Sequence, residues 1–330
     1  MKIVLDITRL VSEGKLTPEE AEQLTALAAR DTGSLTINIL MSFGAVAVAA
    51  GILALHPDFA TGAALGAALA LIGVLLSSVL AARWSLVGAA NVVVGGLMLA
   101  GGAIGLGDGS LAGFAVAVIV LLGLALVARN GLLMALAPLA LAALLGSSTG
   151  YAHASYMLVV SEPTITIVVF ALLALAAYLV SQVLEPAYER LAIVFARVSL
   201  ILVNFGFWIG SLWGDYPAQS WLHGEAYYGS AGDHAWREAA LHVPDTFFIL
   251  TWAALIIGVG IWAARTNRRW VVTTAAVFGA IHFYTQWFER LGANPFGVIV
   301  AGLIIVAIAV GLWRYNSARG DATAEQQRAS

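Results

Sequence analysis

The sequence predicts an all-α fold: a polytopic integral membrane bundle of about ten transmembrane helices, with both termini cytoplasmic and a short N-terminal cytoplasmic helical hairpin. Two observations predict it, namely the composition and the placement of the arginines. Of the 330 residues, 61% are hydrophobic and 11% are charged, whereas a soluble domain carries roughly 25% charged residues. The chain therefore cannot cover itself with a polar shell, and lipid must take the place of that shell.

Ten apolar stretches are long enough to span a bilayer, because ~20 helical residues cover ~30 Å of hydrocarbon and a helix pairs its backbone amides internally. The predicted spans are Leu35–Leu55, Thr61–Ala81, Trp84–Leu106, Leu111–Ala128, Leu132–Thr149, Thr164–Val183, Leu191–Trp213, Asp245–Ala264, Trp270–Trp287 and Pro295–Trp313. A short connection joins the fourth and fifth spans, so residues 111–149 form either two spans or a re-entrant hairpin.

The basic residues test this map through the positive-inside rule. With the N-terminus inside, Arg237 and Arg290 are the only basic residues that fall outside, and Arg197 lies just within a span from the inner side. The other basic residues fall in inside segments: Lys2, Arg9, Lys15, Arg30, Arg83, Arg129, Arg190, Arg265, Arg268, Arg269, Arg314, Arg319 and Arg328. Removing one span would scatter them, so the charges support the even count.

Residues 1–34 form the first of three predicted regions, a cytoplasmic two-helix hairpin. Residues 3–12 have a helical apolar period, and Thr17, Pro18 and Glu20 have the order of a capping box with Pro at the first helical position. Two short helices cannot be stable alone, so this hairpin either docks a cytoplasmic protein partner or packs on the chain's own bundle. Residues 35–313 form the transmembrane domain, and residues 314–330 a polar, disordered cytoplasmic tail.

The longest predicted extracytoplasmic loop covers residues 214–244. A short helix over Asp233–Leu241 would place His234, Glu238 and His242 on one face, since they recur every four residues. Imidazole and carboxylate groups at this spacing can bind a divalent metal. The alternative is a solvated loop that rests on the membrane surface through its aromatic residues.

Few polar residues lie within the predicted spans. Arg197 and Asn204 share a face of the seventh span, and His282 and Gln286 lie in the outer half of the ninth. Ionisable groups in a membrane often mark function, so these four residues are candidates for a substrate cavity. The alternative is that Arg197 extends to the lipid headgroups and that the others make hydrogen bonds between helices.

Glycine spacings within the spans indicate close helix packing. Gly206, Gly210 and Gly214 form a G-x-x-x-G-x-x-x-G run, and the pairs Gly62 with Gly66 and Gly101 with Gly105 repeat the spacing. Small residues let membrane helices approach closely. We interpret these glycines as packing positions.

Several chemistries find no support in the sequence. The chain has no Cys, which excludes disulfides and thiolate chemistry. No phosphate-binding loop, dinucleotide fingerprint or nucleophile elbow is present, and no basic, aromatic-rich soluble face predicts nucleic-acid binding. We therefore expect no cofactor, no nucleic-acid partner and no enzymatic activity, with the outer metal candidate as the exception; homo-oligomerisation is left open.

Two segments carry a family resemblance. The N-terminal I-T-R-L-V-S-E-G-K-L-T-P-E-E-A-E-Q-L and the C-terminal F-Y-T-Q-W-F-E-R-L-G resemble the ends of DUF2157, a family of bacterial multi-spanning membrane proteins. The resemblance covers about the first 50 and last 50 residues and implies a bacterial inner-membrane location. It implies no activity and no catalytic residues, and the loop at 214–244 departs from the compact pattern of the family.

Three functions follow as hypotheses. The first is a non-enzymatic scaffold or regulatory membrane protein that contacts a cytoplasmic partner through residues 1–34. The second is a transporter or lipid-handling protein with a polar cavity between the seventh and ninth spans. The third is a metal-dependent enzyme at the outer face.

Overall fold

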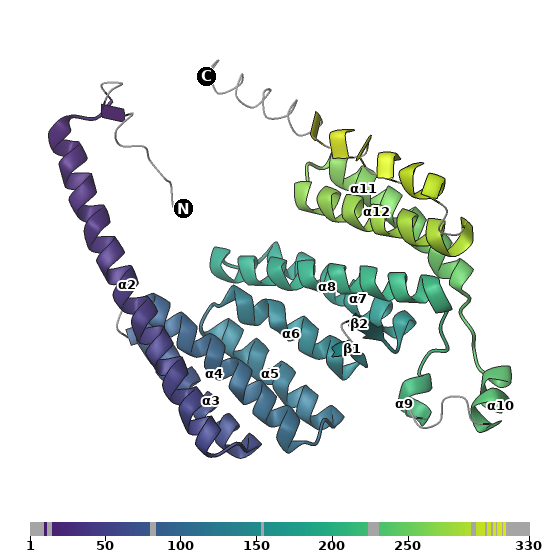
Figure 1. The fold of residues 1–330 in the computed structure, drawn as a ribbon, viewed down its shortest axis with the longest axis horizontal. Coiled ribbons are helices and arrows are strands. Elements are labelled where there is room, and N and C mark those ends of the chain that lie inside the picture. Colours follow the sequence, from purple (N-terminus) through teal and green to yellow (C-terminus); the bar gives the residue numbers. More distant parts are fainter. Residues whose placement is uncertain are drawn as a thin grey trace. The chain divides into compact units, whose positions relative to one another are not determined.

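Of the residues that the structure describes, 84% are helical. The computed structural model describes residues 10–11, 15–79, 84–152, 155–223, 231–291, 295–300, 302–304, 306–307, 309–311 and 313–314. Its named elements (Figure 1) are α2 (Pro18–Leu55), α3 (Phe59–Val79), α4 (Ser85–Leu106), α5 (Leu111–Val127), α6 (Gly131–Leu144), β1 (Ser147–Ala152), β2 (Ser155–Val160), α7 (Pro163–Ser181), α8 (Pro186–Trp213), α9 (Gln219–His223), α10 (Ala231–Ala239), α11 (Asp245–Arg265) and α12 (Arg269–Leu291).

In the described part of the chain, six helices are long and apolar enough to cross a membrane. They are the first, second, third, sixth, seventh and eighth of the predicted spans, and belong to α2, α3, α4, α7, α8 and α11. Three shorter apolar helices, α5, α6 and Pro295–Gly311, lie at the positions of the fourth, fifth and tenth predicted spans, respectively. The ninth lies in α12, a long helix whose polar residues, among them His282 and Gln286, lower its hydropathy.

α2 corrects the prediction of a separate second hairpin helix. It begins at the predicted capping box, where the Thr17 hydroxyl accepts a hydrogen bond from the Glu20 amide and the Glu20 side chain accepts one from the Thr17 amide. The helix then continues without a break from Pro18 to Leu55, and no second proline interrupts it. The first predicted hairpin helix lies outside the described residues except for residues 10 and 11.

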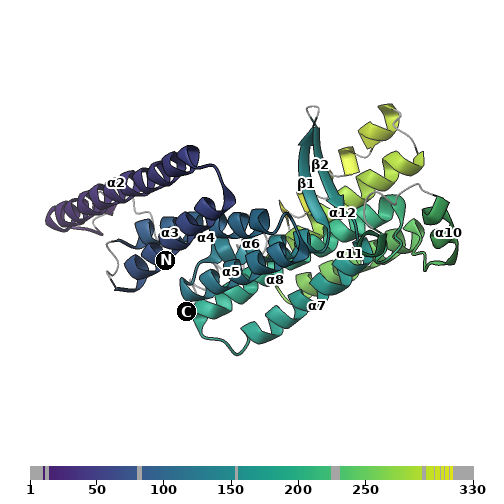
Figure 2. The ribbon, with the colours of Figure 1, turned by 90° about the horizontal axis from the view of Figure 1, so that it is seen from below.

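A β-hairpin corrects the predicted span Leu132–Thr149. α6 ends at Leu144, and β1 then pairs antiparallel with β2 in a register that runs from Ser147 opposite Val160 to Ala152 opposite Ser155 (Figure 2). Serine, threonine and glycine at the start of β1 end the apolar run of α6 and favour turn and strand structure over helix. The apolar residues of α6 led the prediction to continue the span to Thr149, five residues beyond the end of the helix at Leu144.

Residue contacts divide the chain into two compact units, which we describe separately. Unit 1 is Met1–Leu144 with Ala177–Phe195, and unit 2 is Leu145–Ala176 with Ala196–Ser330.

In unit 1, the backbones of α3 and α4 come into contact at glycines that repeat every seven residues on each helix. These are Gly66 and Gly73 on α3, and Gly88, Gly95 and Gly102 on α4. A Cβ added to Gly66 would lie 2.5 Å from the Leu99 amide nitrogen, and one added to Gly95 would lie 2.4 Å from the Ala70 amide nitrogen. By contrast, Gly62 has only a distant side-chain neighbour, and a Cβ on Gly101 would meet nothing within 4 Å. Of the four glycines in the two predicted G-x-x-x-G pairs of α3 and α4, Gly66 and Gly105 have close neighbours, whereas Gly62 and Gly101 do not. The close contact at Gly95 was not part of either pair.

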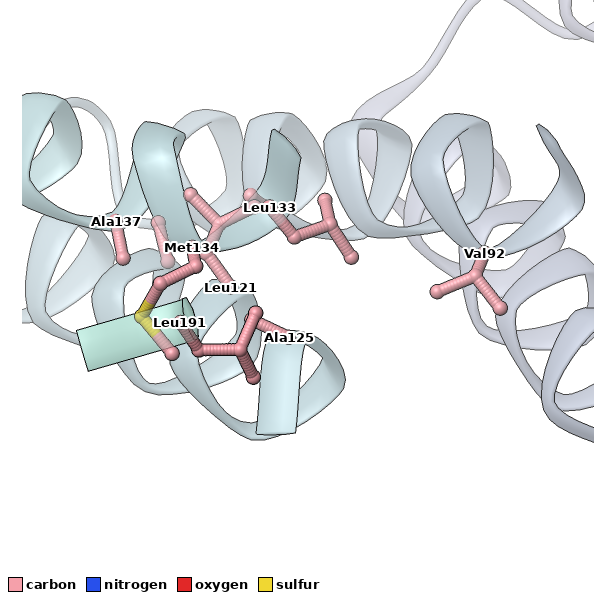
Figure 3. Close-up of a cluster of buried hydrophobic side chains, with 9 residues drawn as sticks. Val92, Leu121, Ala125, Leu133, Met134, Ala137 and Leu191 are labelled. Carbon is pink, nitrogen blue, oxygen red and sulfur yellow. The ribbon is translucent and has the colours of Figure 1, made fainter. Parts of the chain in front are cut away.

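The apolar core of unit 1 lies between α4, α5, α6 and the start of α8. Figure 3 shows its labelled side chains, and its buried members are Val92, Ala100, Ala117, Leu121, Ala125, Leu133, Met134, Ala137 and Leu191. The set combines small alanine side chains with larger valine, leucine and methionine side chains.

In unit 2, aromatic rings fill the space between α8 and α11. The Phe207 ring stacks on Trp252 with centroids 6.4 Å apart and an interplanar angle of 6°. Gly210 leaves room for Phe248, because an added Cβ would lie 2.6 Å from that ring. Gly206 similarly faces Ile167 of α7, so two glycines of the predicted run on α8 pack against different helices.

Candidate functional site

The candidate cavity residues of α8 and α12 lie at a polar helix interface in unit 2. The Asn204 side chain is central: its Oδ1 accepts a hydrogen bond from Trp252 Nε1 of α11 at 2.9 Å, and its Nδ2 donates to the Leu200 carbonyl at 2.8 Å. The His282 ring of α12 meets the same Trp252 edge to face, with centroids 4.8 Å apart. Trp252 thus connects Asn204 and His282 across three helices.

Two further hydrogen bonds join α8 to α12. Trp208 Nε1 donates to Thr285 Oγ1 at 3.1 Å, and Gln286 Nε2 donates to Ser211 Oγ at 3.4 Å. From the first bond to the second, the positions advance by three residues along α8 and by one residue along α12. These bonds are the interhelical hydrogen bonds that one of the two sequence interpretations expects.

Arg197 lies apart from this group. Its side chain is exposed, and its guanidinium carbon lies 5.2 Å from the centroid of the Trp270 ring. It is two turns from Asn204 along α8, about 10 Å at 1.5 Å per residue. The structure therefore brings Asn204, His282 and Gln286 to one interface but does not place Arg197 beside them.

His282 is the candidate with an unsatisfied polar atom. Its Nδ1 is buried and has no hydrogen-bond partner within the described structure. Buried polar groups are nearly always hydrogen-bonded, so an unpartnered ring nitrogen at this interface is an exception that needs an explanation.

The structure does not gather the three metal candidates. α10 ends at Ala239, so His242 is not on the helix that carries His234 and Glu238, and its ring lies 4.6 Å from that of Tyr216. The predicted helix to Leu241 was two residues too long. Among the described residues, no three His, Asp or Glu side chains form a group that could hold a metal ion. His223 and Glu225 lie upstream in the same segment and could also supply an imidazole and a carboxylate, but their side chains are outside the described set.

Sequence reasoning missed a set of buried acidic residues in and near the 214–244 segment. Glu162 is fully buried, Asp233 is 1% exposed and Asp215 is 6% exposed. Asp233 Oδ1 accepts from Gln219 Nε2 at 2.6 Å and pairs with Arg237 Nε at 3.1 Å. This segment is therefore not a loop that only rests on a surface, since it contains a folded polar core.

Glu162 and Asp215 tie this core to the start of α7. The Glu162 carboxylate accepts hydrogen bonds from the amides of Ala218 at 2.6 Å and Ser220 at 2.8 Å, and from the Ser220 hydroxyl. Asp215 Oδ2 accepts from the Thr164 amide at 2.8 Å, and its backbone pairs with Val243. Glu162 comes immediately before Pro163, a typical helix start, and this was the one sequence signal that could have drawn attention to it.

Comparisons with known proteins add no relative: no protein-family model, no curated protein and no solved structure matches the chain.

Proposed function

We propose that the chain is a non-enzymatic scaffold or regulatory protein of a bacterial inner membrane, with ten spans and cytoplasmic termini, that contacts a cytoplasmic partner through residues 1–34. The observation that carries this proposal is the length of α2. Its 38 residues measure about 57 Å at 1.5 Å per residue, whereas a span needs ~30 Å. About half of α2 therefore extends beyond the hydrocarbon, on the side of the N-terminus.

The stretch of α2 outside the apolar window supports a docking role. The apolar window begins at Ile37, and the preceding turns carry Glu19, Glu20, Glu22, Arg30 and Asp31. A continuous helix transmits a fixed orientation from the membrane to whatever binds at its end. The DUF2157 resemblance, which also rests partly on this segment, supports the inner-membrane location.

The polar interface of unit 2 agrees with a structural role for most of the candidate cavity residues. The side-chain amides of Asn204 and Gln286 both bond to neighbouring helices. Groups that satisfy one another in this way stabilise a helix bundle and leave little for a polar substrate to bind.

The topology can be tested directly because the chain has no Cys. Single substitutions Asp58→Cys and Glu238→Cys should react with a membrane-impermeant maleimide in intact cells. Arg129→Cys and Arg268→Cys should react only after the cells are opened. The reverse pattern, or reaction of all four in intact cells, would reject the proposed orientation. A re-entrant hairpin over residues 111–149 would leave Arg268 on the inside but make Arg129 lie within the membrane or outside.

The docking role needs its own experiment. A photo-crosslinking residue at Asp31, which remains when residues 1–30 are deleted, should capture a specific cytoplasmic protein in cells, whereas one at Glu238 should not. Deletion of residues 1–30 should abolish that capture while the remaining chain stays in the membrane. Equal capture without residues 1–30 would show that this region is not the docking site.

A second candidate function, transport or lipid handling through unit 2, is favoured by one observation, the unpartnered Nδ1 of His282. A buried ionisable residue in a membrane helix commonly belongs to an ion or substrate path. The chain reconstituted in vesicles should then change their permeability to protons or small ions, and His282→Leu should remove the change. Equal permeability of parent and variant vesicles would reject this function.

A further inference from the structure

Glu162 and Asp215 cap each other's segments. Glu162 precedes α7, yet its carboxylate bonds to the amides of Ala218 and Ser220 at the start of α9. Asp215 precedes α9, yet its carboxylate bonds to the Thr164 amide in the first turn of α7. We name these five residues the capping cluster; each acidic group in it satisfies backbone donors that the other segment cannot pair internally.

The capping cluster also holds a third element. The Asp215 amide donates to the Val243 carbonyl, and the Val243 amide donates to the Asp215 carbonyl, each at 2.9 Å. Val243 lies two residues before α11. Asp215 therefore connects the starts of α7 and α11 through its side chain and its backbone.

Two features of the cluster oppose its closure. Ala218 has a φ of 69°, which is a left-handed conformation that residues with a Cβ rarely adopt. The carboxylates of Glu162 and Asp215 are both buried, and the nearby Glu162 disfavours the charge of Asp215. The hydrogen bonds must outweigh both effects for the cluster to stay closed.

The charged neighbours do not neutralise Asp215. Glu162 is the charged residue that acts on it within the described chain. On the α10 side Arg237 pairs with Asp233, and at the start of α11 Asp245 accepts hydrogen bonds from Thr246. The titratable ring nearby is His242, which packs on Tyr216 and whose Nε2 would lie 3.2 Å from a Cβ added to Gly214.

We infer that the capping cluster is an acid-tightened latch: protonation of Asp215 strengthens the closed contact between the 215–220 segment and the start of α7, and deprotonation weakens it. A neutral Asp215 still has a carbonyl oxygen that accepts the Thr164 amide. It removes the repulsion with Glu162, whose two carboxylate oxygens accept three hydrogen bonds in the closed cluster.

The direction of the pH effect follows from linkage. Burial raises the pKa of Asp215, with Glu162 adding to the increase against the Thr164 bonds. A group whose pKa is higher in the closed state binds its proton there first, so the closed state gains stability as pH falls through that raised value. The gain is complete below the ordinary Asp pKa of about 3.9, where the open state is protonated as well.

Hydrogen–deuterium exchange of the full chain in detergent tests the latch. Protection factors, corrected for the pH dependence of chemical exchange, are measured for peptides that cover residues 162–167 and 214–223. In the parent protein they should rise as pH falls, by at most about tenfold per pH unit for one proton. In Asp215→Asn, which keeps the acceptor and removes the charge, protection should be high and should lack this pH-dependent increase.

Two controls make the outcome decisive. Asp58→Asn changes an acidic cap in unit 1 and should leave the pH profile of the capping cluster unchanged. If Asp215→Asn does not fold, the parent profile still decides, because the inference requires protection to rise on acidification in both peptides. A flat parent profile, or an equal slope in parent and Asp215→Asn, would overturn the inference; neither result depends on the proposed topology or docking role.

Discussion

The two units hold their helices together by different means. In unit 1, α3 and α4 touch backbone to backbone at Gly66 and Gly95. In unit 2, ring contacts such as Phe207 on Trp252 and side-chain hydrogen bonds such as Asn204 to Trp252 connect α8 to α11, and the bond from Trp208 to Thr285 connects α8 to α12. Lipid provides no hydrophobic force between apolar helices, so association depends on close van der Waals packing or on interhelical hydrogen bonds. This chain uses the first solution in unit 1 and the second in unit 2.

The acidic caps show the same contrast. In unit 1, Asp58 caps its own helix α3: its carboxylate accepts the Thr61 amide at 2.8 Å and the Thr61 hydroxyl at 2.7 Å. In unit 2, Asp215 caps the start of α7 from a distant part of the chain. The bonds from the Thr61 amide and hydroxyl lower the pKa of exposed Asp58, whereas burial raises that of Asp215. Acid is therefore expected to weaken the contact made by Asp58 and to strengthen the contact made by Asp215.

The largest expected effect comes from filling the glycine contact of unit 1. Gly95→Val would place a Cβ 2.4 Å from the Ala70 amide nitrogen and 2.6 Å from the Gly66 carbonyl oxygen, and neither backbone atom can move without separating the helices. We expect a loss of at least about 3 kcal/mol, at the upper end for overpacking, seen as a lower yield of monodisperse protein and a lower Tm in detergent. Gly101→Val on the same helix is the control, because an added Cβ there meets nothing within 4 Å; equal losses in both variants would show that close approach is not the cause.

A smaller loss is expected from the central hydrogen bond of unit 2. Asn204→Leu leaves Nε1 of the buried Trp252 without its acceptor, which costs about 1–2 kcal/mol. Thermal unfolding of Asn204→Leu, Trp252→Phe and the double variant forms a cycle that isolates the bond. Strictly additive effects in that cycle would mean that the bond does not stabilise unit 2.

Thr285→Val should have a weaker effect at the same interface. It removes the acceptor for Trp208 Nε1 at nearly constant volume, and single interhelical bonds in membrane proteins average about 0.6 kcal/mol. The Tm should fall slightly relative to the parent. A fall larger than that of Asn204→Leu would reverse the order of importance that the burial of the two tryptophans indicates.

Acid should loosen the start of α3, which is the smallest effect. The pKa of Asp58 is lowered, so its cap stabilises the helix above the ordinary Asp pKa of about 3.9 and this contribution is lost as pH falls through the lower folded value. Exchange protection of the amides at 59–62 should decrease on acidification, opposite to the 214–223 peptide. Asp58→Asn should flatten this decrease, and a protection that rises with acid at both sites would contradict the contrast between the units.

Local features of the sequence predicted much of the helical architecture. The predicted Trp84–Leu106 and Asp245–Ala264 correspond to α4 at Ser85–Leu106 and α11 at Asp245–Arg265, and the capping box of Thr17 and Glu20 is confirmed. These features depend on neighbours within one or two helical turns, so a single stretch of sequence contains the information. The even span count and the orientation stay predictions, since they depend on charges relative to a membrane.

Only the tertiary structure decided which residues meet. Gly62 and Gly66 have the same G-x-x-x-G spacing as any packing pair, yet Gly66 alone touches another backbone, because helix rotation and register select the contact. Glu162 and Asp215 are isolated carboxylates in the sequence, and the fold makes them one buried cluster. Hydropathy and periodicity determine where helices form, whereas side-chain geometry across helices determines which polar groups pair, and the candidate sites of this protein lie at those pairs.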